Sequence, residues 1–331
     1  MTRSMTPHSF LVLTRSQIES LISLPDAIRV VEEALADFAQ GKSFLFPVIR
    51  ERIDPYGGFF GVKAAYLASR GCLGYKGGGF WATNRDQGLA GHQSVIVLYD
   101  PQTGRPTALM DGNYLTIIRT GAMGAIAAKY LARPDSRSVA VIGAGTQGRI
   151  QLAALREVLA VQEVRCFDLH APSSQAFAAL AIQQGLAATA CATPQQAVAG
   201  ADLIVTATPS LSAIIQDQWI QPGMHINAFG ADTKGKQEID PMALTRAKVV
   251  VDYWPQAREI GECQHAFRSG LIHSVHAELA DIVAGRKPGR ETPTEITLFD
   301  ATGIALQDLV VASCAYEAAL LGGLGIRLQL D

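Results

Sequence analysis

The hydrophobic and polar positions of this chain follow two different patterns, one on each side of about residue 137. Beyond that residue, short apolar runs recur at 139–142, 163–168, 202–208, 225–232, 248–252 and 295–303. Helical segments are predicted between and after them, at 146–159, 173–185, 194–200 and 275–285. Strands that alternate with helices predict an α/β domain built on a doubly wound, parallel (Rossmann) sheet.

The first part of the chain predicts a separate α+β domain. A short strand at 10–13 and two helices, the second following Pro25 and stopping near Gly41, precede a series of strands at 46–53, 59–66, 72–81, 94–99 and 106–110. A turn at 100–104 favours an antiparallel-leaning sheet with the helices on one side. A long helix, 113–131, leads into the second domain, and a last helix from Ile304 to about Leu321 is expected to return to the first. We therefore expect one domain over 1–118, completed by 305–331, and another over 119–304.

A glycine turn carries the most specific chemical signal. Gly143, Gly145 and Gly148 form G-x-G-x-x-G between a predicted strand and a predicted helix, and Asp168 ends the next strand. This order is typical of a dinucleotide site, in which the glycines admit the pyrophosphate to the helix N-terminus and the acid binds ribose hydroxyls. An acid repels a 2′-phosphate, so NAD is favoured, with NADPH as the alternative. The competing interpretation is a tight turn that binds nothing.

Other candidate residues lie at predicted strand ends, where parallel sheets bind their ligands. They are Thr206, Thr208, Gly230 and Asp232.

Cations gather in the first domain, before the glycine turn. They are Arg50 or Arg52, Lys63, Lys76 and Arg119. Cations of this kind can hold a substrate carboxylate so that its reacting carbon faces a nicotinamide. We therefore expect a small anionic substrate; the alternative is a set of solvated charges on sheet edges.

Composition excludes several classes of protein. A net charge of −2 without a long basic run argues against nucleic acid or a membrane surface as partner, and no apolar run has transmembrane length. The apolar stretch near the N-terminus is too short for a signal peptide. Five scattered cysteines without a C-x-x-C pattern predict reduced thiols in a cytoplasmic protein. His273 and His276 lack a third ligand at suitable spacing, so no metal site is expected.

Several motifs together resemble the ornithine cyclodeaminase/mu-crystallin family. They are 111–122 (with Arg119-Thr120), 142–147, 230–238, Gly261-Glu262 and 299–308. The family contains cyclodeaminases, alanine dehydrogenases, ketimine or iminosuccinate reductases, and the cofactor-binding protein mu-crystallin. The resemblance implies a homodimer built through the first, substrate-binding domain, with NAD(P) bound in the second.

The resemblance also assigns roles to residues. Lys76 and Arg119 match the residues that hold the substrate carboxylate, and Arg50 is the better match for a third cation, with Arg52 as the alternative. Asp232 matches the acid at the substrate amine, and Lys76, Arg119 and Asp232 form the expected catalytic set. Thr302 is expected to contact substrate. The expected cofactor contacts are Arg119, Thr120, Gly143, Gly145, Thr146, Gln147, Gly148, Asp168, Thr206, Thr208, Gly230, Asp232 and Lys236.

Two positions favour one branch of the family. In the alignment that this resemblance implies, Gly61 stands near the position where the cyclodeaminases carry a glutamate. Lys63 stands where mu-crystallin-like members carry an apolar residue. Lys63, with His92, would suit a second substrate carboxylate. The pattern is most similar to iminosuccinate reductases, which implies NADH-dependent reduction of a 2-imino acid to an L-amino acid, iminosuccinate giving aspartate. The alternatives are ornithine cyclodeaminase, alanine dehydrogenase, cyclic ketimine reductase and a non-catalytic NAD(P)-binding protein.

Overall fold

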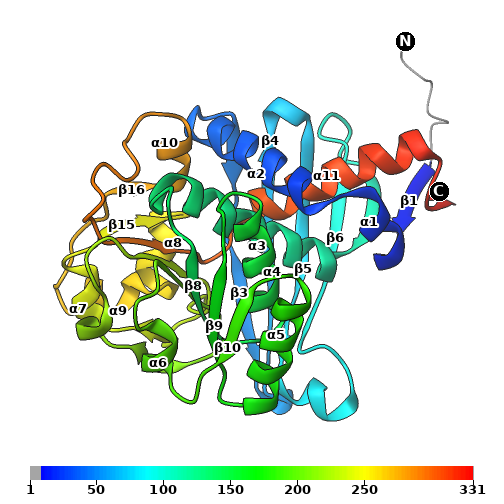
Figure 1. Cartoon of the computed structure of the whole chain (residues 1–331). Coiled ribbons are helices and arrows are strands. Elements are labelled where there is room, and N and C mark those ends of the chain that lie inside the picture. Colours follow the sequence, from blue (N-terminus) through cyan, green and yellow to red (C-terminus); the bar gives the residue numbers. More distant parts are fainter. Residues whose placement is uncertain (1–8, 331) are drawn as a thin grey trace. The chain divides into compact units, whose positions relative to one another are not determined.

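A computed structural model describes residues 9–330 and divides the chain into two compact units (Figure 1). The first unit is Met1–Arg119 with Ile304–Asp331, and the second is Thr120–Gly303. The predicted boundaries, at 118/119 and 304/305, stand one residue from these. The expectation that the N-terminal segment is not a signal peptide concerns mainly residues 1–8, which lie outside the described residues.

The first unit is built on a mixed sheet with the order β18-β1-β7-β6-β5-β4-β2, in which β3 pairs with β4. Its strands are β1 (Ser9–Leu13), β2 (Ser43–Leu45), β3 (Ile49–Ile53), β4 (Gly58–Leu67), β5 (Cys72–Trp81), β6 (His92–Tyr99), β7 (Pro106–Asp111) and β18 (Ile326–Gln329). Every pair is antiparallel except β1 with β7. The expected antiparallel-leaning sheet is confirmed.

The helices of the first unit lie against this sheet. They are α1 (Arg15–Leu21), α2 (Leu24–Ala39), the start of α3 (Gly112–Leu131), and α11 (Ala305–Gly322). The side chain of Ser23 caps α2 by accepting a hydrogen bond from the backbone of Asp26. As expected, α11 returns to the first unit, where it packs against α2, β4, β5 and β6.

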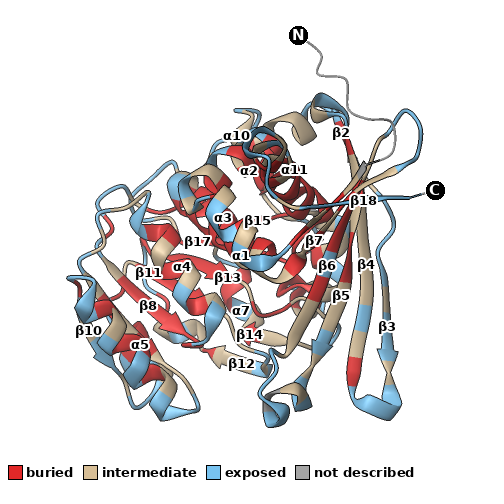
Figure 2. Ribbon diagram, turned by 90° about the vertical axis from the view of Figure 1, so that its right-hand side faces the viewer, coloured by how far each residue is buried: buried red, intermediate tan, exposed pale blue. Residues whose placement is uncertain are grey.

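Helix α11 is buried for most of its length (Figure 2). Among the described residues it is the one helix long and apolar enough to cross a membrane, and 61% of it is buried inside the protein. Core helices pass the same test of length and composition, and its packing is that of a core helix.

One strand was predicted over 46–53, and this was wrong. Within that range only 49–53 is a strand, β3; a separate short strand, β2, ends at Leu45, and the three residues between the two include Pro47. Proline has no N–H to donate to a ladder, so the strand is interrupted at this point.

The second unit contains the predicted parallel sheet, in the order β10-β9-β8-β11-β13-β17-β15-β16. Its strands are β8 (Ser138–Ile142), β9 (Glu163–Phe167), β10 (Ala187–Ala190), β11 (Leu203–Thr206), β13 (His225–Ala228), β15 (Lys248–Val251), β16 (Ala277–Glu278) and β17 (Thr297–Asp300). All its pairs are parallel. A separate ribbon joins β12 (Leu211–Ile215) to β14 (Gln237–Ile239).

Short helices connect these strands. They are α4 (Thr146–Arg156), α5 (Ala171–Gln183), α6 (Pro194–Val198), α7 (Pro241–Leu244), α8 (Trp254–Ile260), α9 (Cys263–Arg268) and α10 (Leu279–Val283). The helix predicted over 275–285 was wrong at its start, because Ala277 and Glu278 extend the sheet by pairing with β15.

Glycines of α3 let this helix approach α4 closely. A Cβ at Gly121 would collide with Ile150, and one at Gly124 would collide with Gln151.

Candidate active site

Two lysines of the first unit face each other across neighbouring strands. Lys63 on β4 pairs directly with Lys76 on β5, so both side chains lie on one face of the sheet. Lys76 is 8% exposed, which rules out a solvated edge charge. Directly opposed like charges destabilise a sheet, so this arrangement requires compensating anions.

A buried carboxylate from α11 provides part of that compensation. Asp308 accepts a hydrogen bond from Lys76 Nζ at 2.8 Å and another from Arg119 Nε at 3.0 Å. Lys76 also donates to the Thr116 hydroxyl at 3.3 Å, and Arg119 Nη1 donates to Gln307 at 2.9 Å. Burial alone would raise the pKa of Asp308, but Lys76 and Arg119 outweigh it and hold that pKa below its usual range.

The geometry favours Arg50 over Arg52 as the third cation. Arg50 pairs with Gly61 and Arg52 with Phe59, two and four residues before Lys63 on β4, so both arginines share its face. Arg52 is largely exposed, forms an ion pair with Asp54 at 2.9 Å and lies over the ring of Phe59.

His92 begins β6, and its Nδ1 lies 3.3 Å from the side-chain oxygen of Asn113. Burial, followed by the charge of Lys76, lowers the pKa of His92 to about 4. The ring is therefore neutral at pH 7, so it can donate a hydrogen bond to a carboxylate but adds no charge.

In the second unit, the glycine turn has the form that a pyrophosphate site requires. Gly143 has φ +100°, and a Cβ at Gly143 or Gly148 would collide with neighbouring backbone. A Cβ at Gly145 would meet no described atom within 4 Å, so the main chain faces open space just before α4. The residues thus fit a dinucleotide phosphate at this helix N-terminus.

The first residues of α4 are the predicted cofactor contacts Thr146 and Gln147. Thr146 is exposed, and Gln147 has a buried side-chain oxygen without a described hydrogen-bond donor. The backbone oxygen of Thr120, in α3, accepts a hydrogen bond from Gln151 at 2.8 Å.

Asp168 follows β9 and is held by two backbone groups. Its oxygens accept hydrogen bonds from Ala144 N and His170 N, each at 2.9 Å. A carboxylate has further lone pairs, so ribose hydroxyls can still donate to it. The same contacts fix the glycine turn to the end of β9.

Glu238 joins the ends of β11 and β13, and sequence analysis assigned it no role. It accepts hydrogen bonds from the Thr206 hydroxyl at 2.6 Å, Thr208 N at 2.6 Å and Gly230 N at 2.8 Å. Thr206 is fully buried in this contact, so the structure gives its side chain a structural partner, and its expected contact with a cofactor stays a prediction.

A second buried acid supports the first. Glu262 accepts hydrogen bonds from the backbone of Glu238 at 2.8 Å and of Ile239 at 3.1 Å. Burial, and then the neighbouring carboxylates, raise the pKa of Glu262 well above its usual value. The motif Gly261-Glu262 marked this position in the sequence, but its partners, more than twenty residues away, did not show there.

Two other predicted residues also have partners within the second unit. Asp232 forms an ion pair with Lys236 at 2.7 Å, which is the pairing expected of a surface loop. The hydroxyl of Thr302 donates to Asp252 at 2.8 Å and accepts from Gln256 at 2.8 Å. Their substrate and cofactor contacts stay predictions.

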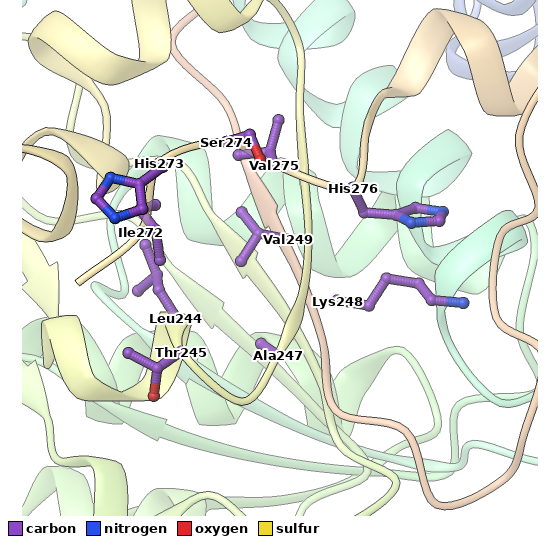
Figure 3. Close-up of a pocket in the computed structure, with 10 residues that line it drawn as sticks. All are labelled: Leu244, Thr245, Ala247, Lys248, Val249, Ile272, His273, Ser274, Val275 and His276. Carbon is purple, nitrogen blue, oxygen red and sulfur yellow. The ribbon is translucent and has the colours of Figure 1, made fainter. Parts of the chain in front are cut away.

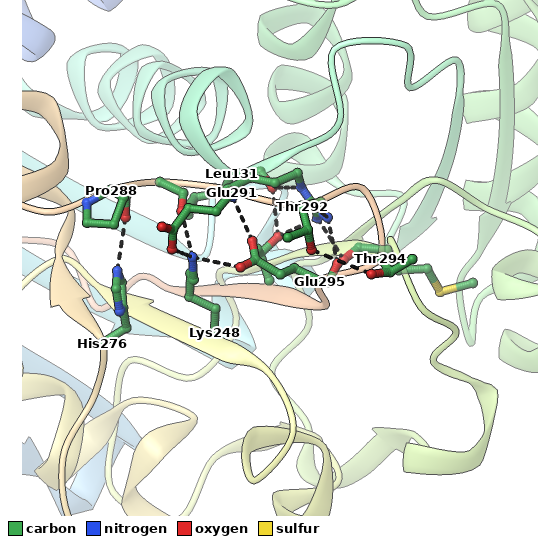
Figure 4. A network of polar contacts seen from close by, with 12 residues as sticks. Leu131, Lys248, His276, Pro288, Glu291, Thr292, Thr294 and Glu295 are labelled. Atoms are coloured by element: carbon green, nitrogen blue, oxygen red, sulfur yellow. Dashed lines mark hydrogen bonds and ion pairs between the residues drawn. The ribbon is translucent and has the colours of Figure 1, made fainter.

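An open cavity elsewhere in the second unit is not part of this site. It is lined by residues 244–245, 247–249 and 272–276 (Figure 3). It lies at the amino end of β15, whereas the glycine turn follows the carboxyl end of the parallel strand β8. Lys248 there binds Glu291 and Glu295 at 2.7 and 2.9 Å, and His276 contacts the backbone oxygen of Pro288 (Figure 4). These contacts hold the loop before β17 in place. No group of three potential metal ligands occurs within residues 9–330.

Comparison with known proteins relates the whole chain to one family. The chain is 40% identical to the alanine dehydrogenase of Archaeoglobus fulgidus, over 96% of this chain and 98% of the relative. It superimposes on the iminosuccinate reductase of Paracoccus denitrificans in complex with NAD+ (TM-score 0.91, 38% identity, 97% and 100% of the two chains). It also superimposes on the Δ1-pyrroline-2-carboxylate reductase of Thermococcus litoralis in complex with NADH and L-proline (0.93, 35%, 96% and 100%).

The family model described as "Ornithine cyclodeaminase/mu-crystallin family" matches residues 9–323. With relatives of 40% and 38% identity over nearly all of the sequence, the protein is a member of the ornithine cyclodeaminase/mu-crystallin family.

Proposed function

We propose that this protein is an NADH-dependent imine reductase whose substrate is iminosuccinate, reduced to aspartate. Its relatives support the general class of the enzyme, an NAD(H)-dependent oxidoreductase that acts on C–N bonds of imino and amino acids. The choice of a dicarboxylate rests on one observation: Lys63 lies directly opposite Lys76 on the face of the sheet that carries the buried cations.

The cations divide between the two ends of such a substrate. In this proposal Lys76, Arg119 and Arg50 hold the α-carboxylate, and Lys63 holds the distal carboxylate with a hydrogen bond from neutral His92. Asp308 offsets one of the four positive charges, so Arg50, Lys63, Lys76 and Arg119 together leave a net charge of +3 to face the substrate's two carboxylates.

Bound NADH would supply the hydride. The main chain at Gly145 would accept its pyrophosphate, and Asp168 its adenosine ribose. Asp232 would orient the imine nitrogen and favour its protonated, more electrophilic form. Its observed partner Lys236 would then turn to the cofactor.

We further propose that the enzyme is a cytoplasmic homodimer. The face of the first unit's sheet opposite the lysines exposes Phe44, Ile49, Phe60 and Val95, each roughly half accessible. Clustered apolar side chains of this kind suit an interface with a second copy. All five cysteines are free thiols, which supports a reducing compartment.

The test measures NADH oxidation with oxaloacetate plus ammonia, pyruvate plus ammonia, and cyclic ketimines, and repeats each with NADPH. Ammonia release from ornithine with catalytic NAD is measured alongside. We expect turnover with oxaloacetate and ammonia to exceed the others in kcat/KM, with NADH preferred. Turnover with pyruvate or a cyclic ketimine alone would retain the reductase class and overturn the dicarboxylate assignment.

A further inference from the structure

We propose that Asp308 is a positioning residue that sets both the geometry and the charge of the carboxylate site, acting through Lys76 and Arg119. The proposal rests on the proposed role of those two cations in binding the substrate carboxylate. Asp308 lies on the first turn of α11, while its partners lie on β5 and α3.

The first argument is geometric. A single oxygen of Asp308 accepts hydrogen bonds from both Lys76 Nζ and Arg119 Nε, at 2.8 and 3.0 Å. The two cations are thereby held on either side of one atom, and Gln307 fixes the far end of the Arg119 guanidinium. Two long, flexible side chains are thus preordered before substrate arrives, which reduces the entropy lost on binding.

The second argument is electrostatic. Lys63, Lys76 and Arg119 approach one another on three elements, with neutral His92 on a fourth and Asp308 as the acid among them. A lysine this buried keeps its proton only if an anion offsets desolvation and the neighbouring positive charges. Asp308, whose oxygen contacts Lys76 Nζ, provides such an anion.

The third argument excludes direct chemistry by Asp308. Its side chain is 0% exposed, and its other oxygen is buried without a described hydrogen-bond partner. A substrate cannot reach it, so its effect must pass through the cations it holds.

The test is Asp308→Asn, which keeps the shape and one acceptor but removes the charge. We expect kcat/KM for the imino acid to fall roughly 30-fold or more, mainly through KM. We also expect the alkaline limb of its pH profile to move down by about one unit or more, because Lys76 loses its proton more readily. KM for NADH should stay unchanged. A fall in kcat with an unmoved pH profile would indicate a merely structural role and overturn the proposal.

A control on the same helix removes the same charge elsewhere. Glu317→Gln, an exposed position, should retain the wild-type pH profile. If Asp308→Asn does not fold, the charge-compensated pair Lys76→Met/Asp308→Asn is compared with Lys76→Met. The pair should fold, and removing Asp308 should cost less carboxylate binding in the Lys76→Met background than in the wild type, because only Arg119 is left for it to act through. An equal loss in the two backgrounds would contradict action through Lys76.

A binding experiment separates this proposal from the proposed function. Calorimetry of the NAD-loaded enzyme with oxaloacetate and with pyruvate, from pH 6 to 9, needs no turnover. If neither the wild type nor the variant turns over iminosuccinate but the variant loses carboxylate binding at high pH, Asp308 retains its role and the substrate assignment fails. Equal binding by both proteins across this range would overturn the role of Asp308.

Discussion

At the scale of single residues, the proposed function makes Lys63 the residue that would distinguish a dicarboxylate site from a monocarboxylate site. Lys63→Met keeps most of the side-chain volume and removes the charge. We expect kcat/KM with oxaloacetate plus ammonia to fall about 30-fold or more, which corresponds to about 2 kcal/mol of transition-state stabilisation. The reason is that one substrate carboxylate loses a charge partner. Activity with pyruvate plus ammonia should change little. Equal losses on both substrates, measured by NADH oxidation, would show that Lys63 serves the α-carboxylate.

His225 makes the second unit sensitive to acid. It is fully buried, between the Thr297 hydroxyl and Asn227, and burial followed by the charge of Arg290 lowers its pKa to about 3. Between pH 6.5 and 3 the unfolded chain therefore binds a proton that the folded chain excludes, and stability falls as the pH falls through 6.5. At pH 5.5 this costs about 1.4 kcal/mol of unfolding free energy relative to pH 8.

His225→Gln should flatten this dependence while lowering stability at all pH values. Urea unfolding followed by tryptophan fluorescence reports it, since two of the three tryptophans, Trp219 and Trp254, lie in the second unit. Burial raises the pKa of Asp300 to about 7, so protonation of Asp300 stabilises the folded chain as the pH falls. This opposite contribution is the same in the wild type and in His225→Gln. His273→Gln, at an exposed histidine, is the matched control. An unchanged slope in His225→Gln would contradict the assignment.

At the scale of elements, the glycine run of β5 is required by its neighbouring strands. A Cβ at Gly79 would collide with the carbonyl oxygen of Phe59 on β4, whereas one at Gly77 would make ordinary contact with Tyr75. We expect Gly79→Ala to destabilise the first unit by about 1–3 kcal/mol. Gly77→Ala should be tolerated. Thermal unfolding of the two variants provides the comparison, and equal melting temperatures would show that β4 and β5 can separate here without cost.

Local elements could be predicted from the sequence because their causes are local. The alternating strands and helices of the second unit and the turn at Gly143 follow from patterns within a few residues. The contacts of Asp308 with Lys76, 232 residues away, and of Glu238 with Thr206 depend on how the finished sheets bring distant segments together. Similarly, the strand at Ala277 exists only because β15 lies beside it.

At the scale of the whole molecule, the second unit is a continuous segment and the first is not. A protein made of residues 120–303 should therefore fold and bind NADH, observed as fluorescence enhancement and a cooperative thermal transition. Residues 1–119 alone should not fold cooperatively, because Leu306, Leu309 and Val310 of α11, all fully buried, would be missing. The full-length chain is the control. A cooperative transition in the 1–119 fragment would contradict this prediction.

The discontinuity of the first unit also orders events during synthesis. Asp308 follows Arg119 by 189 residues, which the ribosome takes about 10 to 40 s to add. During that interval the second unit can emerge and fold, while the sheet that carries Lys63 and Lys76 has neither its core helix nor its balancing carboxylate. The first unit, which carries the cations of the proposed carboxylate site, is therefore completed only after the whole of the second unit has been synthesised.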